Sequence, residues 1–96
     1  MVTIWSLRAK AELKKAYGHI AKDSPKNAIK VRDTLIDLTI ALAKQSEKYP
    51  LDQYRLNNDG TWRAFEKYNY RISYRILPDQ IRIVRLRHTR RSPLQY

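Results

Sequence analysis

The chain of 96 residues contains no cysteine, only two glycines, only two histidines, and no long run of apolar residues. The lack of cysteine excludes disulfides, thiol catalysis and cysteine-bound zinc. Two glycines cannot form a glycine-rich phosphate loop, and no carboxylate cluster has metal-site spacing, so we expect no cofactor and no metal. Without a long apolar run we expect no membrane-spanning segment and no membrane partner. Residues 1–10 lack the apolar core of a secretory signal, so we expect a cytoplasmic protein.

Acidic residues are scarce as well. Nine Asp and Glu stand against twenty Lys and Arg, which gives a formal net charge of +11. A small chain with this excess should bind a polyanion such as nucleic acid, a ribosome or an acidic protein. Residues 1–50 carry eight Lys and two Arg, whereas residues 51–96 carry one Lys and nine Arg. Because arginine offers a rigid fork of donors that matches phosphate, the second half is the expected phosphate-binding part.

The first half of the chain has the patterns of a short strand and two helices. The apolar share of 43% supports one modest core in a single domain and excludes a disordered chain. Residues 1–5 predict a strand. Apolar residues at helical spacing then predict helices over 7–21 and from 25 to about 43–46, with Ser6 and Ser24 as N-caps. The short break between them predicts an antiparallel helical hairpin over residues 7–46.

After residue 50 the apolar period changes from helical to alternating. The pattern predicts a short strand over 54–56 and longer strands over 61–68, 70–77 and 81–88, with short turns between them. Residues 54–88 should therefore form an antiparallel meander, and residues 89–96 a tail without periodicity. A strand, two helices and then a run of strands indicate an α+β fold, with the helical hairpin packed on an antiparallel sheet of about four strands.

Several short motifs occur in a fixed order along nearly the whole chain. They are Ile4-Trp5-Ser6, Glu12-Leu13, Asp23-Ser24-Pro25, Tyr70-Arg71-Ile72-Ser73-Tyr74 and His88-Thr89-Arg90-Arg91. With this set the chain resembles the RelE/ParE superfamily of toxins from type II toxin–antitoxin modules. The resemblance implies a cognate antitoxin whose C-terminal segment wraps the toxin. The positive charge suggests that this segment is acidic. We expect it to cover the Arg-rich sheet face, with the helical hairpin as a further candidate surface, and to fold on binding.

The two branches of the superfamily imply different activities. RelE-like members cleave mRNA in the ribosomal A site without a metal, and ParE-like members bind and poison DNA gyrase. The opening of this chain is similar to ParE, and its ending resembles RelE. Our leading expectation is a ribosome-dependent mRNA endonuclease, so the partners besides the antitoxin would be the ribosome and mRNA. The alternatives are an inhibitor of DNA gyrase without hydrolytic activity and a non-toxic basic module that binds nucleic acid.

Cleavage of RNA by its own 2′-hydroxyl needs a base, an acid and a clamp for the charge that develops on the phosphate. The resemblance to RelE implies that Arg71 on the central strand, Arg90 and Tyr96 belong to the site. Arg63 stands where RelE-type enzymes have a catalytic lysine, and Phe65 replaces a further lysine. Because Arg63 and Arg71 lie on adjacent predicted strands, we expect them to converge with Arg90 on one face of the sheet.

Three side chains are candidates for proton transfer, namely Tyr96, His88 and Glu66. Nearby positive charge would stabilise the phenolate of Tyr96 and lower its pKa. Glu66 could instead pair with an arginine across the sheet, and His88 could be structural. Five further arginines of the second half should form a general polyanion-binding surface without a catalytic role: Arg75, Arg82, Arg85, Arg87 and Arg91.

Overall fold

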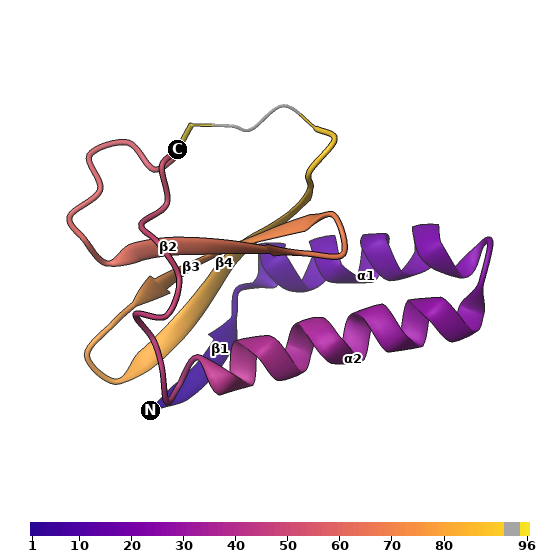
Figure 1. Cartoon of the computed structure of the whole chain (residues 1–96), viewed down its shortest axis with the longest axis horizontal. Coiled ribbons are helices and arrows are strands. Elements are labelled where there is room, and N and C mark those ends of the chain that lie inside the picture. Colours follow the sequence, from indigo (N-terminus) through magenta and orange to yellow (C-terminus); the bar gives the residue numbers. More distant parts are fainter. Residues whose placement is uncertain (92–94) are drawn as a thin grey trace.

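The computed structural model describes residues 1–91 and 95–96 and shows two helices lying against one four-stranded sheet (Figure 1). In chain order the elements are β1 (Val2–Trp5), α1 (Leu7–Ala21), α2 (Pro25–Ala41), β2 (Trp62–Lys67), β3 (Tyr70–Ile76) and β4 (Gln80–His88). The predicted α+β class, with helices packed on one sheet, is confirmed. The second helix ends at Ala41, before the predicted 43–46, and turns follow it. No helix within the described residues is long and apolar enough to cross a membrane.

The sheet has the strand order β1-β4-β3-β2. Strands β2, β3 and β4 pair antiparallel, as the meander predicts. The first strand, β1, is the fourth member of the sheet and runs parallel to β4, so the sheet is mixed and not wholly antiparallel. A parallel pair needs a long connection, which the helical hairpin and the other strands supply here.

The segment 54–56, predicted as a strand, forms turns instead. Its backbone groups bond to the last residue of the chain. The N–H of Leu56 donates to the carbonyl of Tyr96 at 2.6 Å, and the N–H of Tyr96 donates to the carbonyl of Tyr54 at 3.0 Å. The prediction of a sheet strand is therefore wrong, because the partner of this segment is the C-terminus and not a neighbouring strand. This pairing brings Tyr96 beside the loop that precedes β2.

Ser6 joins the sheet to the helical hairpin. Its hydroxyl caps α1 by accepting from the N–H of Ala9 at 3.0 Å, and it donates to the carbonyl of Val84 at 3.3 Å. The Ser6 N–H donates to the carbonyl of Ile83 at 2.9 Å. Further along β4, the Glu12 carboxylate accepts from the N–H of Leu86 at 3.0 Å. The edge of β4 that extends beyond β1 is thus satisfied by the first turns of α1.

Replacing Ser6 by Ala should cost more stability than the same change at the other N-cap, Ser24. Ser6→Ala removes a cap and a hydrogen bond to β4, which together should lower the free energy of unfolding by about 2 kcal/mol. Ser24 caps α2 at an exposed site, so Ser24→Ala should cost about 1 kcal/mol. Urea unfolding of the two variants measures the difference, and equal losses would contradict the double role of Ser6.

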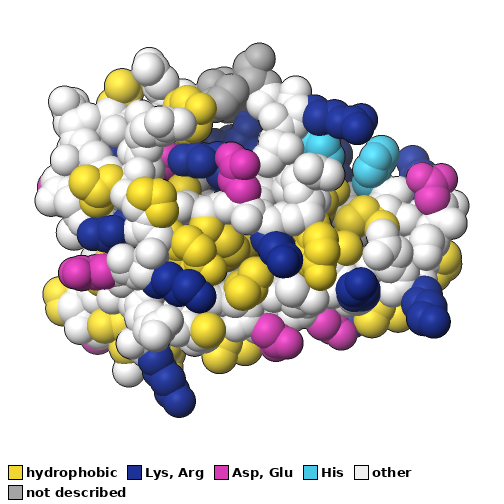
Figure 2. Space-filling view, viewed as in Figure 1, with side chains coloured by type: hydrophobic (Ala, Val, Ile, Leu, Met, Phe, Trp, Pro, Cys, Tyr) yellow, Lys and Arg dark blue, Asp and Glu magenta, His cyan; other side chains and the backbone are white. Residues whose placement is uncertain are grey.

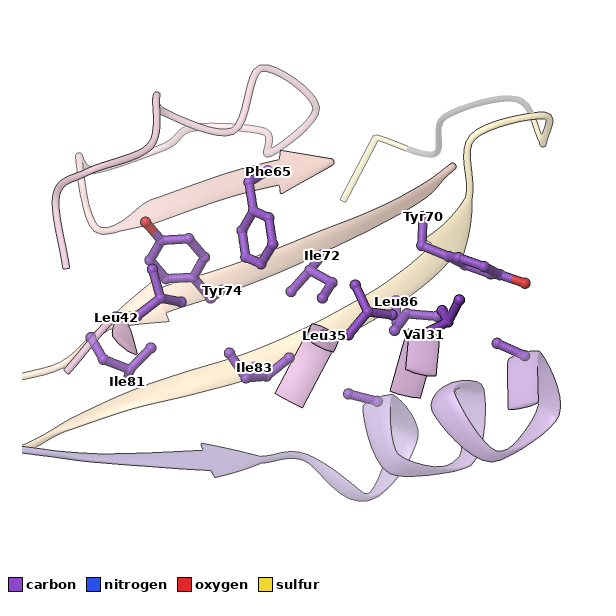
Figure 3. Packing of buried hydrophobic residues seen from close by; sticks show 12 residues of the cluster. Val31, Leu35, Leu42, Phe65, Tyr70, Ile72, Tyr74, Ile81, Ile83 and Leu86 are labelled. Carbon is purple, nitrogen blue, oxygen red and sulfur yellow. The ribbon is translucent and has the colours of Figure 1, made fainter. Parts of the chain in front are cut away.

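The core lies between the helices and one face of the sheet (Figure 3). The helical hairpin covers that face, and Leu35 of α2 packs against the strands. The phenol of Tyr74 donates to the carbonyl of Ser46 at 2.8 Å, and the rings of Tyr49 and Phe65 stack at 4.5 Å. The largest fully buried apolar side chains are Tyr74, Leu35, Leu42, Ile72, Ile81 and Ile83.

A β-bulge in β4 gathers arginines on the opposite, open face of the sheet. The register shifts so that Ser73 pairs with Arg85 and Tyr74 with Ile83, which leaves Val84 as the extra residue. Strict alternation would place Arg82 and Arg85 on opposite faces, but the bulge returns both to one face. The arginines of this open face are Arg71, Arg75, Arg82, Arg85 and Arg87.

Candidate functional site

A pocket of about 230 Å³ lies on the open face of the sheet, where β3 begins and β4 ends. Tyr54 of the loop before β2 and Ser73 of β3 form part of its wall. Four of the six predicted catalytic residues also line it, namely Glu66, Arg71, His88 and Tyr96. Three of the predicted polyanion-binding residues line it as well, namely Arg85, Arg87 and Arg91.

Asp52 bonds to two residues of this pocket, Arg71 and Tyr96, and it is absent from the residues singled out in the sequence. The loop before β2 lies along the outer edge of that strand, where Leu51 bridges to Arg63 and the N–H of Asp52 donates to the carbonyl of Trp62 at 2.9 Å. The side chain of Asn58 fixes the other end of the loop by donating to the carbonyls of Asp52 and Trp62. These bonds point the Asp52 carboxylate inward, where it is fully buried.

The Asp52 carboxylate accepts three hydrogen bonds. The donors are Nη2 of Arg71 at 2.8 Å, the N–H of Tyr54 at 3.0 Å and the hydroxyl of Tyr96. Burial by itself would raise the pKa of Asp52, but the bonds from Tyr96, Arg71 and Tyr54 outweigh it and hold this pKa below its ordinary value. Asp52 is therefore ionised at neutral pH and balances the charge of Arg71. Its turn contact to Tyr54 is a local pattern typical of Asp, whereas its bonds to Arg71 and Tyr96 join distant parts of the chain.

The phenol of Tyr96 is a poor proton-transfer group in this arrangement. Burial, together with the hydrogen bond to Asp52, raises the pKa of Tyr96 to about 12. The expectation that nearby positive charge stabilises its phenolate is wrong, because the hydroxyl faces a carboxylate. The ring of Tyr96 lies edge-on to Trp62 with 5.8 Å between the centroids. Tyr96 thus fastens the C-terminus to the loop and keeps its proton.

Arg71 is held on both sides by carboxylates. Besides the bond to Asp52, its Nη1 lies 3.5 Å from the Glu66 carboxylate, its partner across the β2–β3 pair. The guanidinium also lies 4.8 Å from the centroid of the Tyr54 ring. The ion pair between Glu66 and Arg71 is the cross-strand pairing predicted as the alternative role of Glu66. Arg71 therefore enters the pocket with much of its charge already balanced.

Arg63 does not join Arg71, so the expected convergence is wrong at this position. The cross-strand partner of Arg63 is Tyr74, which faces the core, whereas the partner of Arg71 is Glu66 on the open face. Because side chains alternate along a strand, Arg63 lies on the helix side of the sheet. There its Nη1 donates to the carbonyl of Tyr49 at 2.6 Å. Its role in this structure is to hold the segment that follows α2.

Arg90 does not line the pocket that contains Arg71. It lines a second pocket of about 350 Å³, formed between α1 and the end of β4 together with His19 and His88. The two histidines lie close together in the space-filling view, next to basic side chains (Figure 2). Nδ1 of His88 accepts from the N–H of Arg90 at 3.0 Å, and its ring lies edge-on to Tyr70 at 5.1 Å. Both contacts fit a structural role for His88 at the turn after β4.

The other end of the open face is an arginine–aromatic cluster. The ring of Trp62 has the guanidinium of Arg75 at 4.9 Å from its centroid and that of Arg55 at 3.9 Å. Arg75 also donates to the Thr61 hydroxyl at 3.2 Å, and Arg82 beside it is exposed. Arg55 is a further residue that the sequence did not single out. Within residues 1–91 and 95–96 no group of three or more His, Asp or Glu is placed to hold a metal ion.

Comparison with known proteins agrees with the fold and the motifs. The family model described as the ParE toxin of type II toxin–antitoxin systems, parDE, matches residues 3–93. A solved structure described as the chromosomal ParDE toxin–antitoxin system from P. aeruginosa has a TM-score of 0.71 and 20% sequence identity, and the match covers 92% of this chain and 95% of that chain. At that identity the similarity concerns the fold. No curated protein matches the chain. The extent of the family match shows that this chain belongs to the ParE toxins of type II toxin–antitoxin systems.

Proposed function

We propose that this toxin acts by binding its target, as an inhibitor of DNA gyrase without hydrolytic activity. The observation that carries the proposal is the network around Asp52, which engages both Arg71 and Tyr96. The ParE-like opening of the sequence and the family match support the same branch of the superfamily. Family membership also implies an antitoxin, and we propose that its toxin-binding segment is acidic and covers the open face.

The geometry is unfavourable for RNA cleavage in three respects. Tyr96 holds its proton with a pKa of about 12, so it is a weak acid at neutral pH. The charge of Arg71 is balanced by Asp52, which leaves less of it for a phosphorane. Arg63 lies on the other face of the sheet. The residues that a RelE-type mechanism would use are therefore held by partners inside the protein or separated from one another.

One observation favours the second candidate, a ribosome-dependent mRNA endonuclease. The pocket combines four arginines, which can bind a phosphate, with Glu66 and His88, which can move a proton. Glu66 is 56% exposed at its side chain, so it is accessible to a substrate. This candidate requires Glu66 or His88, and not Tyr96, to act in proton transfer.

Two parallel assays with the purified protein decide between the candidates. We expect inhibition of DNA supercoiling by purified gyrase, and an uncut message when primer extension follows cell-free translation. Cut message together with unaffected gyrase would overturn the proposal and favour the endonuclease. An assay of both activities at one series of protein concentrations prevents a weak side effect from deciding the outcome.

Tyr96→Phe gives a second discriminating result. A nuclease that uses this phenol for proton transfer should lose about 100-fold in rate without it. An inhibitor that acts by binding should lose less than about threefold per folded molecule, since the change removes one hydroxyl that faces Asp52. The matched control is Tyr68→Phe, an exposed tyrosine on the β2–β3 turn. Circular dichroism shows how much of each variant is folded.

A further inference from the structure

Arg87 is a half-buried arginine of the open-face pocket, and it has no carboxylate partner within the described residues. Arg71 pairs with Asp52 and Glu66, and Nε of Arg85 lies 3.5 Å from the Glu12 carboxylate. Within residues 1–91 and 95–96 no acidic group comes within 4.0 Å of the Arg87 guanidinium. Arg87 faces Arg71 across the β3–β4 pair. A half-buried cation in this position gains from an anion that comes from outside the chain.

The surroundings of Arg87 are crowded with positive charge. Burial, and then the charges of Arg85 and Arg91, lower the pKa of Arg87. Arg85 is only 9% exposed, and its Nε and Nη2 find no hydrogen-bond acceptor in the described part of the chain. The ion pair with Glu12 is therefore long and does not satisfy Arg85 fully. Both arginines make the pocket more attractive to an anion than an exposed basic patch would be.

The charged side chains around the pocket sum to one net positive charge. Its four arginines are Arg71, Arg85, Arg87 and Arg91. The carboxylates paired with them are Asp52, Glu66 and Glu12. One monovalent anion would neutralise the cluster, and a pocket of about 230 Å³ has room for an acidic side chain.

We propose that this pocket binds one acidic side chain of the antitoxin, whose carboxylate pairs with Arg87. The proposal rests on the acidic antitoxin segment proposed above, and it does not depend on gyrase as the target. A carboxylate suits the pocket because Arg71 and Arg85 already take carboxylates as partners. A nucleic-acid backbone would bring a row of phosphates past the exposed carboxylate of Glu66 at the pocket wall, which would repel them.

The test measures binding of the purified cognate antitoxin to toxin variants by calorimetry. Arg87→Gln should weaken binding by about 30-fold or more, because it leaves the incoming carboxylate without its partner. The matched control is Arg82→Gln, which removes the same charge from an exposed position on the same face, outside the pocket. That change should weaken binding by less than about threefold. Arg87→Lys keeps the charge, so its loss of binding affinity should lie between the losses of these two variants. This variant also tests the proposal if Arg87→Gln folds poorly.

A double-mutant cycle identifies the acidic residue. Each Asp or Glu of the antitoxin segment is changed to its amide and measured against wild-type toxin and the Arg87→Gln variant. One acidic residue should lose its effect in the Arg87→Gln background. Equal weakening by Arg82→Gln and Arg87→Gln, or the absence of any coupled acidic residue, would overturn the proposal. Competition by a DNA or RNA duplex that displaces the antitoxin from the wild type but not from the Arg87→Gln variant would also overturn it. None of these measurements uses gyrase, so a negative result here would reject the antitoxin contact without rejecting gyrase as the target.

Discussion

Replacing Asp52 by Asn should lower the free energy of unfolding by about 3 kcal/mol. The fully buried carboxylate balances Arg71, whose side chain is 19% exposed, and it accepts from Tyr96 and the Tyr54 N–H. An amide keeps the shape but leaves the Arg71 charge without its buried partner. In a domain of this size the midpoint of thermal unfolding should fall by about 10–20 °C. Urea and thermal unfolding followed by circular dichroism measure both quantities.

The matched control is Asp37→Asn on the exposed side of α2, which should change stability by less than about 0.5 kcal/mol. The effect at Asp52 should also depend on pH. Its pKa in the folded protein lies below the ordinary 3.8, so the stabilisation is complete at neutral pH and is lost as the pH falls through and below that value. The wild type and Asp52→Asn should therefore approach each other in stability in acid. A gap that stays constant down to strongly acidic pH would contradict the role of the ionised carboxylate.

Alkaline pH should unfold the protein in a transition coupled to two tyrosines. Burial raises the pKa of Tyr74 to about 12, and burial with the Asp52 hydrogen bond does the same for Tyr96, against 10.0 for an ordinary tyrosine. A raised pKa means that folding favours the neutral phenol, so its contribution is complete below pH 10.0 and is lost as the pH rises toward 12. Each group should contribute about 2–3 kcal/mol, or about 5 kcal/mol together.

Tyrosinate absorbance and circular dichroism followed across that range test the coupling. The absorbance of the buried tyrosines should rise in the same cooperative step in which secondary structure is lost. Tyr96→Phe should reduce the loss of stability between pH 10.0 and 12 by about half, whereas Tyr68→Phe at an exposed position should leave it unchanged. Ionisation of Tyr74 before any loss of structure would contradict the burial argument. Tyr74 lies within the core, so its phenolate has no access to water in the folded protein.

The helices and their beginnings were predictable because their signals are local. Ser6 and Ser24 each cap a helix as the sequence indicates, and the apolar spacing that follows each serine marks the buried side. The three later strands were predictable from alternation and turn residues in the same way. The exception is the segment 54–56, whose alternation resembles a strand although its partner is Tyr96.

The candidate site was predictable in part. The resemblance to RelE-type enzymes implied a site with Arg63, Arg71, Arg90, Tyr96, His88 and Glu66, and four of these six residues line the pocket. The sequence did not indicate Asp52, because a single aspartate in a loop has no periodicity and its partners are far away in the chain. The predicted position of Arg63 was also wrong. The face of the sheet on which a side chain lies depends on the strand register, and one residue more or less in a turn reverses it.

By itself, the sequence determined the α+β class, the helical hairpin, the meander and the arginine-rich second half of this toxin. These features follow from residue content and from the spacing of apolar residues within short segments. The tertiary structure decided which arginines share a face, which of them are already neutralised and which keep a charge for a partner. A bulge at Val84 brings Arg82, Arg85 and Arg87 together, and the buried carboxylate of Asp52 engages Arg71 and Tyr96. The physical reason is that strand register and charge pairing are set by contacts between distant residues, which no local pattern records.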